Sequence, residues 1–468
     1  MGSRTSLKKM GADWRYWLLA TAVLLHLAMM GSLFWGYLDL LFEGTRFDLV
    51  GLDFFSIYEA GRRALENEPL YAGGFGVAVD APYSVAYRYV PAFAYLFAAP
   101  VSTAPPWWAF WGWVAFNELL LLVNAYVTWR ISARGTWGLI AASMWFLFTP
   151  FYLHQYLGQF TFVMATALFW AGIGIVRGRE IVAGIPWLAS LVTKSTSVLL
   201  GPLFIRLMWW RSLIVAAVLA LVNIPYFLWR TNEFDLFYRM NVLGLFTEQQ
   251  DRVVHFNSAD HSAPALLRNA FLAFDSSAID VPPVYAIGLL IIIVGFSLEA
   301  TFLARKADPL SLFAMWVSVF FLTYWAWEFD YVMLLGPLVL LIIFRPAARP
   351  WAIVAFVLIA LPTPFWLIDS LWSSEPAVEV DPSLIHLFGP EVAAAIQSVR
   401  DVPTGPGNPF LVQETWPAAA VIFYHAMKPV GATLLWGYLV VSQLRTGITV
   451  SAFWHDAGTA EEARQPAT

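Results

Sequence analysis

Lys194 lies in the middle of a long apolar run, "IVAGIPWLASLVTKSTSVLLGPLFI", and is one of only five lysines in the chain. A charged side chain inside an apolar membrane segment is costly and commonly marks a substrate or ion site. An ammonium group with hydroxyl neighbours is suited to hold a phosphate as a point charge. The alternative is an interfacial lysine whose charged end extends to water.

Asp53 opens the segment "DFFSIYEAGRRALENEPLY", in which apolar and charged residues recur with helical spacing. This pattern predicts an amphipathic helix that lies on the membrane surface. An aspartate at the first residue of such a helix fits an N-cap. It also fits a carboxylate at the membrane–water boundary that acts as a general base. The two interpretations are compatible, because one oxygen can cap the helix while the other faces a substrate.

Further polar side chains stand next to apolar segments and are candidates for substrate binding. They are His154, Gln155 and Gln159 in "FYLHQYLGQF", Glu328 and Asp330 in "WAWEFDYV", and His261 and Arg268 in "HFNSADHSAPALLRNA". An interfacial aromatic belt with polar tips would explain the first group, and acids at a helix N-terminus would explain the second. The histidine spacing in the third matches no zinc pattern. We therefore expect no metal and no other cofactor.

The composition is that of a membrane protein that crosses the bilayer several times. Of 468 residues, 59% are hydrophobic and 13% are charged, whereas soluble domains average about 25% charged residues. The first apolar stretch is too long for a cleaved signal and is expected to remain as a span. A net charge of −5 without a dense basic patch excludes nucleic acid as a partner. The absence of cysteine excludes disulfides and thiolate chemistry.

Apolar runs approaching the roughly 20 residues that a span requires occur along the whole chain. The candidate spans are 16–38, 107–129, 137–153, 160–176, 212–229, 282–304, 309–326, 331–345, 350–369 and 417–444. The run 181–207 forms either one tilted helix or two half-length helices that meet at Lys194.

Short basic turns between these spans predict the topology, because such turns face the cytoplasm. They can all do so if 87–103 lies at the outer interface and 181–207 crosses as two half-length helices. The result is an all-α protein with about twelve crossings, both termini in the cytoplasm, and Lys194 at the outer face. We expect one membrane domain, 1–468. Its parts are a module at 16–230 with outer loop 39–106, a second outer loop at 231–281, C-terminal helices at 282–445 with outer loop 370–416, and a disordered cytoplasmic tail at 456–468.

Four stretches in order resemble the multi-pass glycosyltransferases of the GT-C fold. These stretches are "DFFSIYEAGRRALENEPLY", "YRYVPAFAYLFAAP", "LGQFTFVMATALF" and "GIPWLASLVTKSTSVLLGPLFIRLMWWR". Together they are most similar to glycosyltransferase family 87, the polyprenyl-phosphate-mannose-dependent mannosyltransferases. Each stretch alone is a weak signal, whereas four in sequence are more specific. The chain departs from the family pattern at Ser195, where proline is usual, and at Phe329 and Asp330, where a histidine is common.

The resemblance implies an inverting transfer of a hexose, mannose in the family, from a polyprenyl-phosphate donor to a lipid-linked or glycan acceptor outside the cytoplasm. It makes 16–230 the catalytic module, Asp53 the general base and Lys194 the ligand of the donor phosphate. Arg62, Arg88 and Arg268 are candidate helpers at the phosphate, and Tyr58 and Tyr89 join the substrate-binding candidates.

Two other classes of protein fit the same sequence features. A transporter or flippase for a lipid-linked sugar would also place a lysine in the membrane, but such proteins often carry internal repeats, and this sequence shows none. A non-catalytic assembly subunit could retain the same fold. An enzyme is distinguished from both by a cavity that holds Asp53 and a cation together.

Overall fold

The computed structural model describes residues 14–38, 50–71, 87–133, 135–238, 260–274, 284–363 and 417–445. Within these ranges every regular element is a helix, and one isolated β-bridge joins Asp260 to Trp327. The predicted all-α class is therefore confirmed. The tail 456–468, the outer loop 370–416 and large parts of the loops 39–106 and 231–281 lie outside the described residues.

The helices follow the predicted apolar runs, with several of the runs divided. In the first half they are α2 (Trp14–Phe34), α4 (Leu52–Leu65), α5 (Pro91–Phe93), the π-helical η1 (Ala94–Ala98), α6 (Ala99–Val101), α7 (Pro106–Ile131), α8 (Thr136–Phe146), α9 (Thr149–Leu157), α10 (Thr161–Val176) and α11 (Glu180–Thr193).

The second half continues in the same way. Its helices are the 3₁₀ segment η2 (Ser195–Leu200), α12 (Gly201–Arg206), α13 (Trp210–Leu221), α14 (Ile224–Trp229), α15 (Thr231–Tyr238), α17 (Ala263–Phe274), α18 (Val284–Phe302), α19 (Pro309–Thr323), the 3₁₀ turn η4 (Glu328–Tyr331), α20 (Val332–Phe344), α21 (Arg349–Ala360) and α25 (Ala418–Leu444).

The length and composition of the described helices are those of a membrane protein. Five stretches are long and apolar enough to cross a bilayer: α2, α7, α8 with α9, α13 with α14, and α18. The predicted spans 137–153 and 212–229 are therefore each divided into two helices, and Pro150 and Pro225 lie at the starts of the second ones. Proline suits this position because it lacks the N–H that a helix interior requires.

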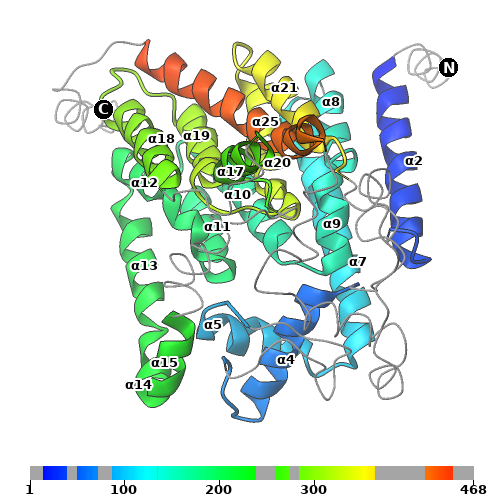
Figure 1. Cartoon of the computed structure of the whole chain (residues 1–468), viewed down its shortest axis with the longest axis vertical. Coiled ribbons are helices and arrows are strands. Elements are labelled where there is room, and N and C mark those ends of the chain that lie inside the picture. Colours follow the sequence, from blue (N-terminus) through cyan, green and yellow to red (C-terminus); the bar gives the residue numbers. More distant parts are fainter. Residues whose placement is uncertain are drawn as a thin grey trace, which may run out of the picture.

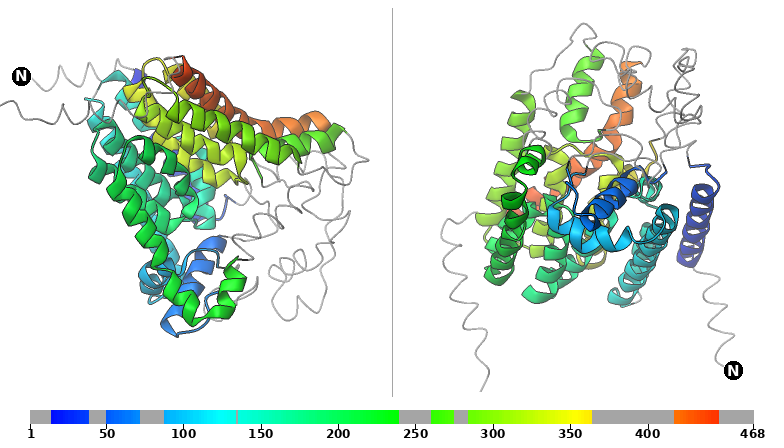
Figure 2. Two further views of the ribbon diagram at one scale, coloured as in Figure 1. Left: turned by 90° about the vertical axis from the view of Figure 1, so that its left-hand side faces the viewer. Right: turned by 90° about the horizontal axis from the view of Figure 1, so that it is seen from below.

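The centre of the molecule is formed by α10, α19 and α20. Almost every side chain of α19 and α20 is buried, and α10 packs against both α11 and α20. By contrast, α2, α13 and α18 expose many large apolar side chains, as expected of helices that face lipid. Figure 2 shows α2 at the edge of the molecule in the view from below.

The 181–207 run is broken at Lys194, as the two-helix alternative predicts. Helix α11 ends at Thr193, Lys194 has an extended backbone (φ −153°, ψ 116°), and η2 starts at Ser195. Because the backbone leaves the helical conformation there, the hydrogen bonds of the two helices do not continue through the lysine. The chain thus presents Lys194 at a helix junction.

Helices α4, α5, α14 and α15 lie at one end of the molecule, and the start of α2 and the end of α25 lie at the other (Figure 1). The predicted interfacial stretch 87–103 forms α5, η1 and α6. These helices together have eleven residues, which rise about 17 Å and cannot cross roughly 30 Å of hydrocarbon. They pack against α4. The apolar side of α4 is therefore covered by protein, whereas its Leu65 is exposed.

Candidate active site

Asp53 is held at the start of α4, but it is not the N-cap of that helix. Gly51 occupies the N-cap in a left-handed conformation (φ 79°), and no side chain caps the helix. The N-cap interpretation of Asp53 was therefore wrong. The sequence pattern marked the start of the helix to within two residues, a usual uncertainty, and Gly51 rather than an aspartate suits a positive φ. The carboxylate lies in the first turn, where the helix dipole favours negative charge.

The carboxylate of Asp53 lies among polar groups from four other parts of the chain. Burial raises its pKa to about 6, while the hydrogen bond from Gln159 and the nearby positive charges of Lys194 and Arg88 act in the opposite direction. The negative charge of Asp330 adds to the increase. A carboxyl group with a pKa near 6 can accept a proton at neutral pH and is a stronger base than an ordinary aspartate.

The C-terminal turn of α9 positions Gln159. Gly158 ends the helix with φ 66°, and the amide N–H of Gln159 donates to the carbonyl of His154 at 3.0 Å. A β-carbon at Gly158 would lie 2.5 Å from Cβ of Phe54, the neighbour of Asp53. Glycine is required here for both reasons. The N–H of Gly51 also donates to the Tyr156 carbonyl at 2.7 Å, so α9 and α4 are joined directly at the site.

Lys194 makes an ion pair with Asp330. Its Nζ lies 2.6 Å from Oδ1 of Asp330, and the Thr161 hydroxyl donates to the same oxygen at 3.3 Å. The second carboxylate oxygen accepts the Trp327 N–H at 3.1 Å. The Asp330 side chain is 4% exposed and that of Lys194 is 27% exposed. The lysine thus retains a face that is open to a ligand, while the aspartate is almost enclosed.

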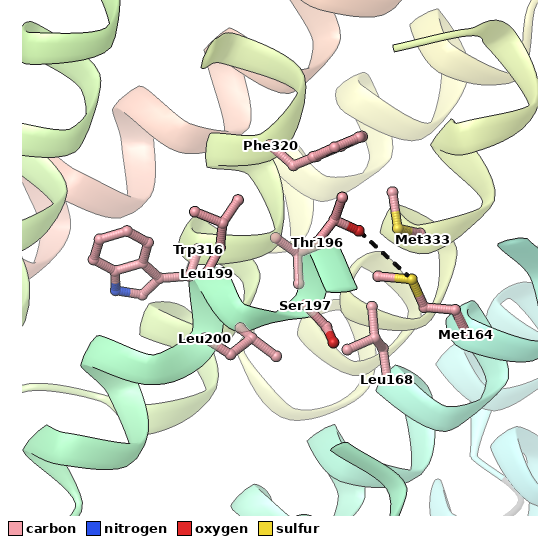
Figure 3. A pocket seen from close by; sticks show the side chains of 10 residues that line it. Met164, Leu168, Thr196, Ser197, Leu199, Leu200, Trp316, Phe320 and Met333 are labelled. Atoms are coloured by element: carbon pink, nitrogen blue, oxygen red, sulfur yellow. Dashed lines mark hydrogen bonds between the residues drawn. The ribbon is translucent and has the colours of Figure 1, made fainter. Parts of the chain in front are cut away.

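An apolar pocket, shown in Figure 3, is lined in part by residues that follow the members of this ion pair in the sequence. It is small and is lined by Met164, Leu168, Thr196, Ser197, Leu199, Leu200, Trp316, Val317, Phe320 and Met333. Met164 and Met333 follow Thr161 and Asp330 by three residues, and Thr196 follows Lys194 by two. Residues three apart lie on one face of a helix. The pocket is thus close in the chain to the residues of the ion pair, and its wall consists mostly of hydrocarbon and sulfur groups.

Three more of the predicted residues lie near the same centre. The Tyr89 ring stacks on Phe93 with centroids 4.9 Å apart, and the pKa of Tyr89 is raised by burial and by the charges of Asp53 and Asp330. Arg88 is exposed and within electrostatic range of Asp53. His154 is fully buried, close enough to Lys194 for their charges to interact, and neither of its ring nitrogens has a hydrogen-bond partner.

Two predicted residues of α4 point elsewhere. The Arg62 guanidinium is paired with Glu59, at 2.8 Å, and with Glu66, so its charge is balanced within the helix. The Tyr58 hydroxyl donates to the Ala104 carbonyl at 2.7 Å. The Arg62 pairs lie within α4 and its C-cap, and the Tyr58 bond joins α4 to the turn after α6. Neither side chain is directed to Asp53.

Three other predicted residues, His261, Arg268 and Glu328, belong to a second buried polar cluster. Here the Glu328 carboxylate pairs with Lys428 of α25 at 3.0 Å and accepts the Thr363 hydroxyl. His261 lies with its ring 5.4 Å from that of His425, and burial lowers the pKa of His261 and of Arg268. We call this group, with Asp260, the second cluster.

Gln155 belongs to a third polar group, which the sequence analysis missed. Its Nε2 donates to Oε1 of Glu118 at 2.9 Å, and the other oxygen of Glu118 lies 2.8 Å from Nε2 of His26. Glu118 is the one acidic residue of α7, in the middle of "WWAFWGWVAFNELLLLVNAYVTWRI". A lone carboxylate inside a span is itself a functional signal, and the sequence contained it.

In the part of the chain that the structure describes, no three His, Asp or Glu side chains are arranged to hold a metal ion. The groups around Asp53 are a second carboxylate, that of Asp330, the two cations Lys194 and Arg88, and the hydrogen-bond donor Gln159.

The family model of glycosyltransferase family 87 matches residues 87–326, more than half of the chain. The chain belongs to glycosyltransferase family 87. No curated protein matches the sequence of this family 87 enzyme. The matched range contains Arg88, Tyr89, His154, Gln159 and Lys194, and it ends before Asp330. Asp53 precedes it, so the case for that residue rests on its position beside the matched groups.

Proposed function

We propose that this family 87 glycosyltransferase transfers a hexose, with mannose the first sugar to test, from a polyprenyl-phosphate donor to a lipid-linked or glycan acceptor. The observation that carries the proposal is the meeting of Asp53 with Lys194 and Gln159 beside an apolar pocket. A base, a cation for the leaving phosphate and a site for hydrocarbon are the three groups that such a reaction requires.

In the proposed reaction the acceptor hydroxyl attacks the anomeric carbon of the sugar. Asp53 takes the hydroxyl proton as the new C–O bond forms. The bond between the anomeric carbon and the phosphate oxygen breaks on the opposite face, and its electron pair leaves with the phosphate. Lys194 stabilises that charge. One displacement inverts the anomeric configuration, as in inverting glycosidases, which have no covalent sugar intermediate.

The donor is expected to lie with its phosphate at Lys194 and its first isoprene units against the apolar side chains that line the pocket. The open face of the lysine supports this placement, because the ion pair with Asp330 leaves 27% of the Lys194 side chain exposed. Arg88 is an exposed second cation close to Asp53. We place this end of the molecule outside the cytoplasm and both termini inside it, in agreement with the basic turns.

The test is an assay of the purified protein with a panel of radiolabelled polyprenyl-phosphate sugars and with membrane extract as acceptor. We expect label to pass from the mannosyl donor into extractable product, with inverted anomeric configuration by NMR. An Asp53→Asn protein prepared in the same way is the control and should give little product. Transfer from nucleotide sugars alone, or retention of configuration, would overturn the proposal.

A further inference from the structure

The Glu118 carboxylate and the His26 imidazole form a pair inside the helix bundle, and no step of the proposed mechanism uses them. Glu118 is residue 13 of the 26 in α7 and His26 is residue 13 of the 21 in α2. Their atoms Oε2 and Nε2 are 2.8 Å apart, and their side chains are 22% and 6% exposed. A costly pair at mid-span calls for a role.

The hydrogen bonds around His26 assign its protons. The Tyr152 hydroxyl donates to the Phe146 carbonyl at 2.6 Å, so its own proton is committed there. Nδ1 of His26, 3.1 Å from the Tyr152 oxygen, must therefore be a donor. The remaining contact, between Nε2 and Glu118, then contains one proton, which lies on either the imidazole or the carboxyl group. In both forms the pair is neutral as a whole, which suits its location.

The other oxygen of Glu118 fixes α9, the helix that directly precedes Gln159. Gln155 of α9 donates to it at 2.9 Å. Five residues earlier on α7, Nε1 of Trp113 donates to the Gln159 carbonyl at 3.2 Å. Helix α7 thus holds the last turn of α9 at two points, and that turn presents the side chain of Gln159 to Asp53.

From this chain of contacts we infer that Glu118, supported by His26, is a positioning residue for Asp53. It acts through Gln155 and the last turn of α9, which set the place of Gln159 against the carboxylate. The inference rests on the proposed function of Asp53 as base. Among the described residues, the polar and charged groups that act on Asp53 are Gln159, Arg88, Tyr89, Lys194 and Asp330. A shift of Gln159 therefore changes the acidity of Asp53.

The test compares Glu118→Leu with Glu118→Gln. A glutamine can donate to Nε2 of His26 and accept from Gln155, so it keeps both contacts, whereas leucine removes them. We expect Glu118→Leu to lower kcat about tenfold, the effect of one hydrogen bond, with the donor KM unchanged. The acid limb of kcat/KM should move to higher pH, because the bond from Gln159 lowers the pKa of Asp53. Glu118→Gln should behave as wild type.

Two further variants keep the test decisive. If Glu118→Leu does not fold, Gln155→Leu removes only the link to α9 and should give the same kinetic change. The double variant Glu118→Leu, Gln159→Leu should be no worse than Gln159→Leu, since both act through one contact. A wild-type pH profile in folded Glu118→Leu or Gln155→Leu, or equal damage in Glu118→Gln, would overturn the inference. Asp53→Asn is measured alongside: normal turnover in that variant would instead overturn the proposed function.

Discussion

The group around Asp53 and the second cluster each contain a lysine–carboxylate ion pair. They differ in how much of the lysine side chain is exposed and in how many hydrogen bonds its ammonium group makes. Lys428 is 0% exposed, and its Nζ lies near Glu328 and donates to the carbonyls of Ile359 and Leu361 at 3.1 and 2.8 Å. Lys194 is partly exposed and, among the described residues, forms an ion pair with one carboxylate, that of Asp330. A fully bonded ammonium stabilises a fold, whereas a partly exposed one can bind a ligand.

The difference also concerns what surrounds each pair. The ion pair of Lys194 adjoins an apolar pocket, and Asp53 lies nearby with a raised pKa. The second cluster joins α17, the η4 turn and α25 through side chains that are buried almost completely. We therefore regard the first group as the site of chemistry and the second as a connection between the C-terminal helices, and the following changes test that contrast.

The largest effect is expected for Asp53→Asn. The variant should lose roughly 10²-fold or more in kcat, the usual contribution of a general base. Its stability at pH 7 should equal or exceed that of wild type, because an ionised carboxylate whose pKa burial has raised to about 6 destabilises the folded state above that pH. Single-turnover kinetics and thermal unfolding measure the two. A loss of both activity and stability would make Asp53 structural, like the second cluster.

Lys428→Met should have the opposite character. It leaves the buried Glu328 carboxylate without its cation, and breaking such a pair costs about 3–5 kcal/mol of folding stability. The kcat of the folded fraction should stay within about twofold, well under one tenfold step of 1.4 kcal/mol. Denaturation in detergent and activity per folded molecule check this. The matched double variant, Lys428→Met with Glu328→Gln, should recover part of the stability.

Lys194→Met tests whether Lys194 binds the phosphate of the donor. We expect kcat/KM for the donor to fall by an amount equivalent to about 1.5–3 kcal/mol, the value of a hydrogen bond to a charged group. Because Asp330 loses its partner too, Lys194→Met with Asp330→Asn serves as the control for stability. If that double variant regains wild-type donor kinetics, Lys194 is only a counter-ion for Asp330, and the contrast with Lys428 disappears.

The smallest effect is a shift in pH dependence. Wild-type kcat/KM should fall as pH decreases through about 6, where Asp53 takes up a proton. Gln159→Leu removes a hydrogen bond to the charged carboxylate, so the pKa should rise and the acid limb should move up by about one pH unit. Gln155 of α9 does not contact Asp53 directly. The Gln155→Asn variant, which shortens that side chain, should therefore move the acid limb less than Gln159→Leu does. An unmoved limb in Gln159→Leu would remove Gln159 from the site.

The sequence predicted the helices well because apolar periodicity follows directly from burial. The break at Lys194 was one of two stated alternatives, and the structure selects it. The N-cap predicted at Asp53 is two residues too late. The observed N-cap is Gly51, which has no side-chain oxygen that would mark it as a cap in the sequence. The separation of Glu328 from Asp330 could not be predicted. They are two residues apart, but the 3₁₀ turn η4 directs one side chain to Lys428 and the other to Lys194. Only tertiary contacts decide such a division.

The break at Lys194 has a consequence for the membrane itself. Helix α11 has fourteen residues, which rise about 21 Å, whereas the hydrocarbon layer measures about 30 Å. A bilayer that meets a helix this short responds by thinning or by tilting its lipids, since hydrophobic mismatch is costly. We expect the leaflet nearest Lys194 to be drawn inward around α11, so that its headgroups come closer to the lysine. If the proposed donor binds at Lys194, a thinned bilayer would let its phosphate reach the lysine while staying at its usual depth among the headgroups.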